Sequence, residues 1–165
     1  MSVARQTPQD AALYCAVDCA ADQRLYGAVL QAGRGTALFA GELHPDLAEA
    51  TPHLVQVDQD SALLALLASP EGRAGAFGCV LRAHPHMATV WRALRKHLLA
   101  RMPDGRVVMF RFFDPRVMAP YLGSLTPSEL APWFAHVSDW WLPLPDGTWH
   151  FTLSDTGLSR SVIPA

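Results

Sequence analysis

The order of apolar and polar residues predicts that strands and helices alternate from the start of the chain. Residues 12–17 form a short apolar run that is typical of a buried strand. Asp22 is suited to cap a helix after this strand, and Gly33 is suited to end it. The apolar side of the helix is expected to contain Leu25, Tyr26, Val29 and Leu30. The chain therefore opens with a strand followed by a helix.

The alternation continues through the first half of the chain. Three further apolar runs are candidate strands: 36–40, 54–57 and 74–82. Asp60 or Ser61 is positioned to cap a leucine-rich helix that ends before Pro70.

The clearest helical pattern extends from His86 to about Arg101. Apolar residues recur there with helical spacing, at Met87, Val90, Trp91, Leu94 and Leu98. The polar side carries Arg92, Arg95 and Lys96. Arg92 and Lys96 are like charges one turn apart, an unfavourable pairing that an acidic partner would relieve. A solvated basic face is the simpler interpretation of these residues, and a docking surface for a partner protein is the alternative.

A proline-aspartate-glycine turn at 103–105 separates this helix from a segment rich in β-formers, 106–113. In an extended chain Val107, Met109, Arg111 and Phe113 would lie on one face, and Val108, Phe110 and Phe112 on the other. Apolar residues on both sides are typical of a strand that is buried on both faces. We therefore expect 106–113 to be an internal strand.

Two later helices have well-defined starts. Asp114 and Pro115 are suited to be a cap and a first helical residue, and Thr-Pro-Ser-Glu at 126–129 is a capping box with proline in the first turn. After them, residues 140–144 and 148–153 predict a β-hairpin around a second proline-aspartate-glycine turn.

Together these elements predict an α/β (α+β) fold. The sheet is expected to be mixed or largely antiparallel and flanked by helices, with a helical segment before the C-terminal β-hairpin. No repeat or linker interrupts the pattern, so residues 1–153 are expected to form a single domain. Residues 154–165 are expected to be a polar C-terminal tail.

Composition excludes several classes of protein. Of the 165 residues, 50% are apolar and 17% are charged, which argues against disorder. A net charge of -2 provides no basic field for nucleic acid. The sequence has no signal-peptide pattern and no apolar run of membrane-spanning length, so we expect a cytoplasmic protein without membrane insertion. Cys15, Cys19 and Cys79 lie in apolar segments and are expected to be buried free thiols.

No standard catalytic motif is present in the sequence. It lacks the nucleophile elbow of hydrolases, the phosphate-binding P-loop and the H-E-x-x-H helix of metalloproteases. His84 and His86 could share a metal ion, but a third ligand at suitable spacing is missing, so ordinary loop histidines are the preferred interpretation. We therefore assign no catalytic, cofactor-binding or metal-binding residue.

The densest charged cluster within an apolar stretch consists of Arg111, Asp114 and Arg116. In an enzyme Asp114 could act as a general base, but flanking arginines would stabilise its ionised form and make it a poor one. An aspartate before Pro115 is also what the start of a helix requires. A structural motif, an ion pair combined with a helix cap, is therefore predicted for Arg111, Asp114, Pro115 and Arg116.

The C-terminal hairpin is rich in tryptophan. Trp140 and Trp141 are adjacent on a strand, so their side chains must point to opposite faces of the sheet. One of them is then available to anchor a partner protein, unless a helix or the tail covers it. Trp140, Trp141 and Trp149 are therefore candidate partner-binding residues, together with the basic helix face.

Five segments occur in a characteristic order: 54–61 (LVQVDQDS), 75–79 (GAFGC), 92–98 (RALRKHL), 103–106 (PDGR) and 110–117 (FRFFDPRV). Over roughly residues 13–142 the chain resembles the type VI secretion effector chaperone, or adaptor, family, a domain family formerly of unknown function and associated with the VgrG spike. The segment 111–116 is the most specific part. The chain departs from the usual family pattern at Phe113, where tyrosine is common.

The resemblance implies a non-enzymatic protein without a cofactor, which binds a type VI effector in the cytoplasm and helps load it onto the VgrG spike. Two other classes stay open. An immunity-type toxin-binding protein would bind an effector but not the spike. A small hydrolase or transferase with an unrecognised site would have a cleft in which titratable groups converge.

Overall fold

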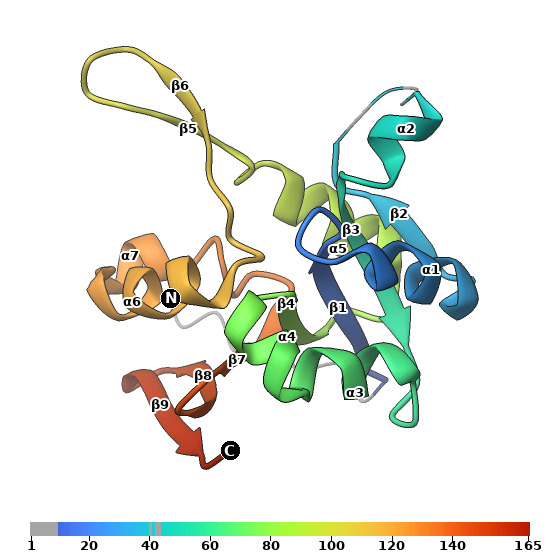
Figure 1. The fold of residues 1–165 in the computed structure, drawn as a ribbon. Coiled ribbons are helices and arrows are strands. Elements are labelled where there is room, and N and C mark those ends of the chain that lie inside the picture. The colour runs from blue at the N-terminus through green and yellow to red at the C-terminus, as the bar shows by residue number, and fades with distance from the viewer. Residues whose placement is uncertain (1–9, 40, 42–43) are drawn as a thin grey trace.

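The computed structural model describes residues 10–39, 41 and 44–165, and its centre is an antiparallel sheet with helices on both faces (Figure 1). The strand order is β2-β3-β1-β4-β7-β8-β9. These strands are β1 Ala12–Asp18, β2 Gly35–Ala37, β3 Pro52–Val57, β4 Gly78–Ala83, β7 Val137–Leu144, β8 Gly147–Ser154 and β9 Gly157–Ile163. The helices are α1 Gln23–Ala32, α2 Pro45–Ala48, α3 Ala62–Ala68, α4 Pro70–Gly75, α5 Met87–Arg95, α6 Pro115–Ser124 and α7 Pro127–Leu130. The predicted α+β fold with a largely antiparallel sheet is confirmed.

Each face of the sheet has its own core, as the alternation of side chains along β1 illustrates. Tyr14 and Ala16 belong to the larger core, which includes residues of α5, α6 and α7. Cys15 and Val17 belong to a second core, formed with α1 and α3. All four side chains are fully buried. The apolar run at 12–17 is therefore a strand covered on both sides, as the sequence predicts.

The start and the end of α1 are set by local signals. Asp22 accepts a hydrogen bond from the backbone N–H of Arg24, and Gly33 ends the helix in the left-handed conformation, with φ 68°. One predicted apolar position of this helix is wrong, because Leu30 is 62% exposed. It follows the buried Val29 directly and is turned by about 100° around the helix axis, away from the core.

The predicted starts of three other helices are confirmed. Ser61, rather than Asp60, caps α3. Asp114 caps α6, and Thr126 forms a capping box with Glu129 at α7. None of the helices in the described residues is long and apolar enough to cross a membrane.

Two helices, α2 and α4, were not expected from the sequence, and another is shorter than predicted. Ser69 caps α4, and Pro70 is its first residue, so this proline begins a helix as well as ending one. The strand predicted at 74–82 consequently starts only at Gly78. The helix predicted to reach Arg101 ends at Arg95.

The prediction of an internal strand at 106–113 is wrong. Only Val107–Met109 form a strand, β6, which pairs with β5, Leu99–Arg101, in a separate two-stranded sheet. All residues of β6 are exposed. Apolar residues on both faces of a strand show that it could be buried, but another part of the chain has to cover it, and here none of the described residues does.

The C-terminal hairpin is confirmed, but the expectation for the tail is wrong. Gly157–Ile163, within the segment expected to be a polar tail, form β9 and pair with β8 from Thr148 to Ser154. A strand at the edge of a sheet needs backbone hydrogen bonds and one partly covered face, which Leu158 supplies by packing against the larger core. The short strand β2 lies within the range predicted near 36–40, although Ala40 is outside the described residues, as are residues 1–9.

Candidate partner-binding surfaces

A two-stranded arm, residues 99–109, projects away from the sheet and its helices (Figure 1). Its two ends are anchored at the body of the protein. The backbone N–H of Phe110 donates a hydrogen bond of 2.7 Å to the carbonyl of Leu98, and Leu98 is buried in the larger core. Phe110 packs on Tyr121, with ring centroids 4.6 Å apart. The arm therefore has a fixed base and a free tip.

One face of the arm is apolar and open to solvent. Leu99 pairs with Met109, and Arg101 pairs with Val107. These four side chains lie on the same face, because directly opposite residues share a face and residues two apart along a strand do as well. Leu99, Val107 and Met109 are 61%, 54% and 48% exposed. Exposed apolar side chains that are contiguous in this way are typical of an interaction surface.

The basic residues predicted on the helix lie in α5 and directly after it, next to the base of the arm. Arg95 lies over the ring of Trp91, 4.4 Å from its centroid, and Arg92 donates to the carbonyl of Ala88. Arg92 and Lys96 are exposed. The structure thus places the predicted basic face beside the arm, whereas its role in binding stays a prediction.

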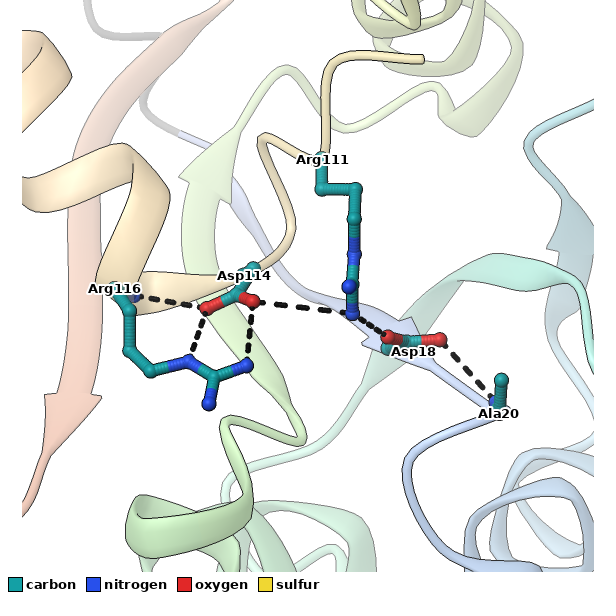
Figure 2. Close-up of polar contacts among 5 residues, drawn as sticks. All are labelled: Asp18, Ala20, Arg111, Asp114 and Arg116. Atoms are coloured by element: carbon teal, nitrogen blue, oxygen red, sulfur yellow. Dashed lines mark hydrogen bonds and ion pairs between the residues drawn. The ribbon is translucent and has the colours of Figure 1, made fainter.

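The charged cluster at 111–116 holds the chain where it leaves the arm (Figure 2). Asp114 accepts hydrogen bonds from the backbone N–H and Nε of Arg116 at 3.0 Å and from its Nη2 at 2.8 Å. Arg111 pairs with Asp18 at 2.5 Å and approaches Asp114 at 3.8 Å. The cluster therefore ties the end of β1 to the start of α6.

These contacts favour the structural interpretation of the cluster over a catalytic one. Asp114 is 2% exposed, and both of its carboxylate oxygens are occupied by Arg116. A general base needs an oxygen that is free to reach a substrate. Asp18 also belongs to this charged cluster, although the sequence analysis did not identify it. The one sequence feature that could have indicated Asp18 is its position as an acidic residue at the end of an apolar run.

The two adjacent tryptophans of β7 point to opposite faces of the sheet, as predicted. Trp140 is fully buried in the larger core, so it is no longer a candidate for partner binding. Trp141 is partly exposed and stacks on His150, with centroids 4.8 Å apart and an interplanar angle of 6°. The guanidinium of Arg82 lies 5.3 Å from the ring centroid of Trp141. Of the pair, Trp141 alone is accessible.

Trp149 is also partly exposed; it lies in β8 opposite Leu142 and packs against the larger core. Its Nε1 donates a hydrogen bond to Asp146 at 3.3 Å, and Arg160 lies 4.6 Å from its ring centroid. These contacts fix the orientation of the indole at the surface.

Comparison with known proteins identifies the family. Residues 13–132 match the family model of a domain of unknown function, DUF4123. The chain belongs to the DUF4123 family. This family is associated with the loading of type VI secretion effectors, in agreement with the resemblance seen in the sequence. No curated protein and no solved structure matches the chain significantly.

The DUF4123 match covers the arm and the charged cluster and ends before β7. The arm is the part of this DUF4123 domain that sequence reasoning missed, because its apolar residues were expected to be buried. A signal was present in the tight turn at 103–105, which contains Asp104, is followed by Arg106 and is typical of a solvent-exposed hairpin.

The cysteines of this DUF4123 domain are buried and free, as predicted. Burial raises the pKa of the Cys15 and Cys79 thiols far above the usual range. Burial and the neighbouring Asp18 raise the pKa of Cys19 to about 12. Because the thiolate is the reactive form, these cysteines are poor nucleophiles at neutral pH.

The histidine pair lies close to a third histidine that the sequence did not point to. The rings of His84 and His86 have centroids 5.2 Å apart, and His136 lies 6.1 Å from His84. Even so, no group of three or more histidine, cysteine or acidic residues in the described part of the chain has the geometry to hold a metal ion.

A surface depression of about 260 Å³ lies between α1 and α3 beside β3. Its lining residues Arg34 and Asp58 pair with each other at 2.7 Å, and the hydroxyl of Ser61 caps α3. Three of the polar side chains that line the depression, Arg34, Asp58 and Ser61, are thus engaged with one another or with the backbone.

Proposed function

We propose that this DUF4123 protein is a non-enzymatic adaptor, or chaperone, that binds a type VI secretion effector in the cytoplasm and helps load it onto the VgrG spike. The observation that carries the proposal is the arm at 99–109, which presents apolar side chains to solvent within a family associated with effector loading. A protein that must hold another protein needs such a surface, since apolar patches of this kind are typical of protein interfaces.

The surroundings of Asp114 and of the three cysteines support a binding role over a chemical one. The carboxylate of Asp114 is occupied by Arg116, and burial raises the pKa of each of the three thiols. An immunity-type protein would also bind an effector, but it would have no reason to bind the spike. Binding to both proteins is therefore the property that separates an adaptor from an immunity protein.

Deletion of the gene tests the proposal. We expect the secretion machine of the deletion strain to fire normally, measured by release of its tube and spike components, while delivery of one effector is lost. The purified chain is expected to form a stable complex with that effector and to bind VgrG. Loss of every effector at once would indicate a role in the machine itself, and binding to neither protein would contradict the proposal.

A further inference from the structure

We propose that the arm and the adjacent end of α5 form one docking surface for an effector segment that is both apolar and acidic. The inference rests on the proposed function, because the occupant is the cargo of the adaptor. It adds the chemistry of that cargo and the residues that recognise it.

The apolar half of the surface is the face of the arm formed by Leu99, Val107 and Met109. These three side chains are about half exposed or more and lie next to one another on one face. A two-stranded hairpin is only marginally stable alone in water, and covering one of its faces stabilises it. An apolar segment laid on this face would bury three side chains that no described part of the chain covers.

The charged half of the surface is basic in an otherwise acidic protein. Residues 92–111 contain six arginines and lysines and one acidic residue, Asp104, in a chain of net charge -2. The six are Arg92, Arg95, Lys96, Arg101, Arg106 and Arg111. Arg106 pairs with Asp104, and Arg111 pairs with Asp18. Among the described residues the other four have no ion-pair partner.

This arrangement favours an acidic occupant. Arg92 and Lys96 lie one helical turn apart, and Arg101 lies on the apolar face of the arm beside Val107. Carboxylates between these cations would relieve the repulsion between the first two and would pair with the third. A basic segment would meet uncompensated like charge, so the surface also selects against it.

The base of the arm is rigid enough to present this surface in one place. His97 stacks on Trp133, with ring centroids 3.9 Å apart, directly before the buried Leu98. Phe110, which directly follows the second strand of the arm, packs on both Tyr121 and Trp133. A surface held in position before binding loses less conformational entropy when a partner docks.

The test uses the full chain and the effector whose gene lies beside its own, titrated against each other by calorimetry. The triple variant L99S/V107S/M109S is expected to weaken binding by about tenfold or more. Val108→Ser is the matched control, because Val108 is an exposed residue of β6 on the opposite face of the arm. We expect the control to change Kd by less than about twofold.

The expected negative charge of the occupant is tested by reversing the charge of the basic residues that would contact it. The variants R101E and R92E/R95E/K96E are expected to slow association with the same effector and to reduce the dependence of Kd on salt. Arg34→Glu is the control, since this exposed arginine lies in the loop after α1. Unchanged salt dependence in both reversal variants would overturn the acidic character of the occupant.

Hydrogen exchange locates the occupant without any substitution. The amides of 99–109 are expected to exchange more slowly in the complex than in the free chain. If the complex forms but these amides are unchanged, or if the triple variant binds as tightly as the wild type, this inference fails while the proposed function stands. If no complex forms with the effector or the spike, the proposed function fails and the inference fails with it.

Discussion

At the scale of single residues, Asp114 combines a helix cap with an ion pair. Asp114→Ala is expected to lower the free energy of unfolding by about 1–3 kcal/mol, because α6 loses its cap and Arg116 loses its partner. Thermal melts of the two proteins measure the change.

Two variants sharpen the test at Asp114. Asp114→Asn can still cap the helix but carries no charge, so it is expected to melt between the wild type and the alanine variant. Asp58→Ala removes an exposed ion pair and is expected to change stability little. An unchanged melting midpoint in Asp114→Ala, together with loss of effector binding, would show that Asp114 is a contact residue instead.

His97 makes stability depend on pH. Burial, with repulsion from Lys96, holds the pKa of His97 below its usual value of 6.5. As the pH falls, His97 is therefore protonated in the unfolded chain at a higher pH than in the folded protein. The contribution of neutral His97 is thus complete above pH 6.5 and decreases as the pH falls through 6.5 towards the lower folded pKa.

His97→Phe keeps an aromatic ring against Trp133 and removes this titration. Urea unfolding at about pH 7.5 and about pH 5.5 is expected to show a smaller loss of stability in the variant than in the wild type. Some loss should persist, because burial also lowers the pKa of His53. Equal losses in the two proteins would show that His97 is not linked to folding.

At the scale of elements, the arm separates into a structural base and a solvent-exposed part. Leu98→Ala is expected to cost about 2–4 kcal/mol, because Leu98 is buried in the larger core. Leu99→Ser, one residue later, is expected to cost less than about 1 kcal/mol, because this side chain is exposed. Urea denaturation of both variants makes the comparison. A large loss in Leu99→Ser would mean that the arm folds back onto the body.

Elements with a local cause were predictable from the sequence, and those with a tertiary cause were not. The capped helices begin where Ser61, Asp114 and Thr126 place them, since a cap acts within a few residues. By contrast, Val107–Met109 have the pattern of a buried strand, and only the folded chain shows that nothing described covers them. The strand β9 also depends on a distant cause, because it forms by pairing with the edge of β8.

The residues of the candidate surfaces also divide into those predictable from neighbouring residues and those that depend on the folded chain. The cap and ion pair at Asp114 follow from neighbouring residues, whereas Asp18 joins the cluster across 93 positions of sequence. Pattern alone showed that Trp140 and Trp141 point to opposite faces of the sheet. It could not show which of the two is accessible, because that depends on how α6, α7 and the larger core are placed.

At the scale of the whole molecule, the arm and the C-terminal hairpin are well separated (Figure 1). An adaptor that contacts two proteins needs two such surfaces, and Trp141 is an accessible aromatic residue of the C-terminal hairpin. Trp141→Ala is expected to weaken the binding of one partner by about 2 kcal/mol or more. Titration of the variant against both the effector and VgrG measures the loss.

Folding has to be followed alongside, because Trp141 also stacks on His150. Loss of that stack is expected to cost only about 1 kcal/mol of stability. Thr152→Ala, on the same face of β8, serves as the control and is expected to bind both partners normally. Normal binding of both partners by Trp141→Ala would remove this face from the candidate surfaces.

The hydrogen bond between Phe110 and Leu98 closes the arm at its root, and this has a consequence for how relatives can diverge. Because both ends of 99–109 meet at this hydrogen bond, a change in the length of the segment is expected to leave the rest of the fold in place. The entropy of closing such a loop grows only slowly with its length, by about 0.6 kcal/mol for each doubling. If the arm and the end of α5 bind the effector as proposed, grafting both between relatives is expected to transfer the choice of effector.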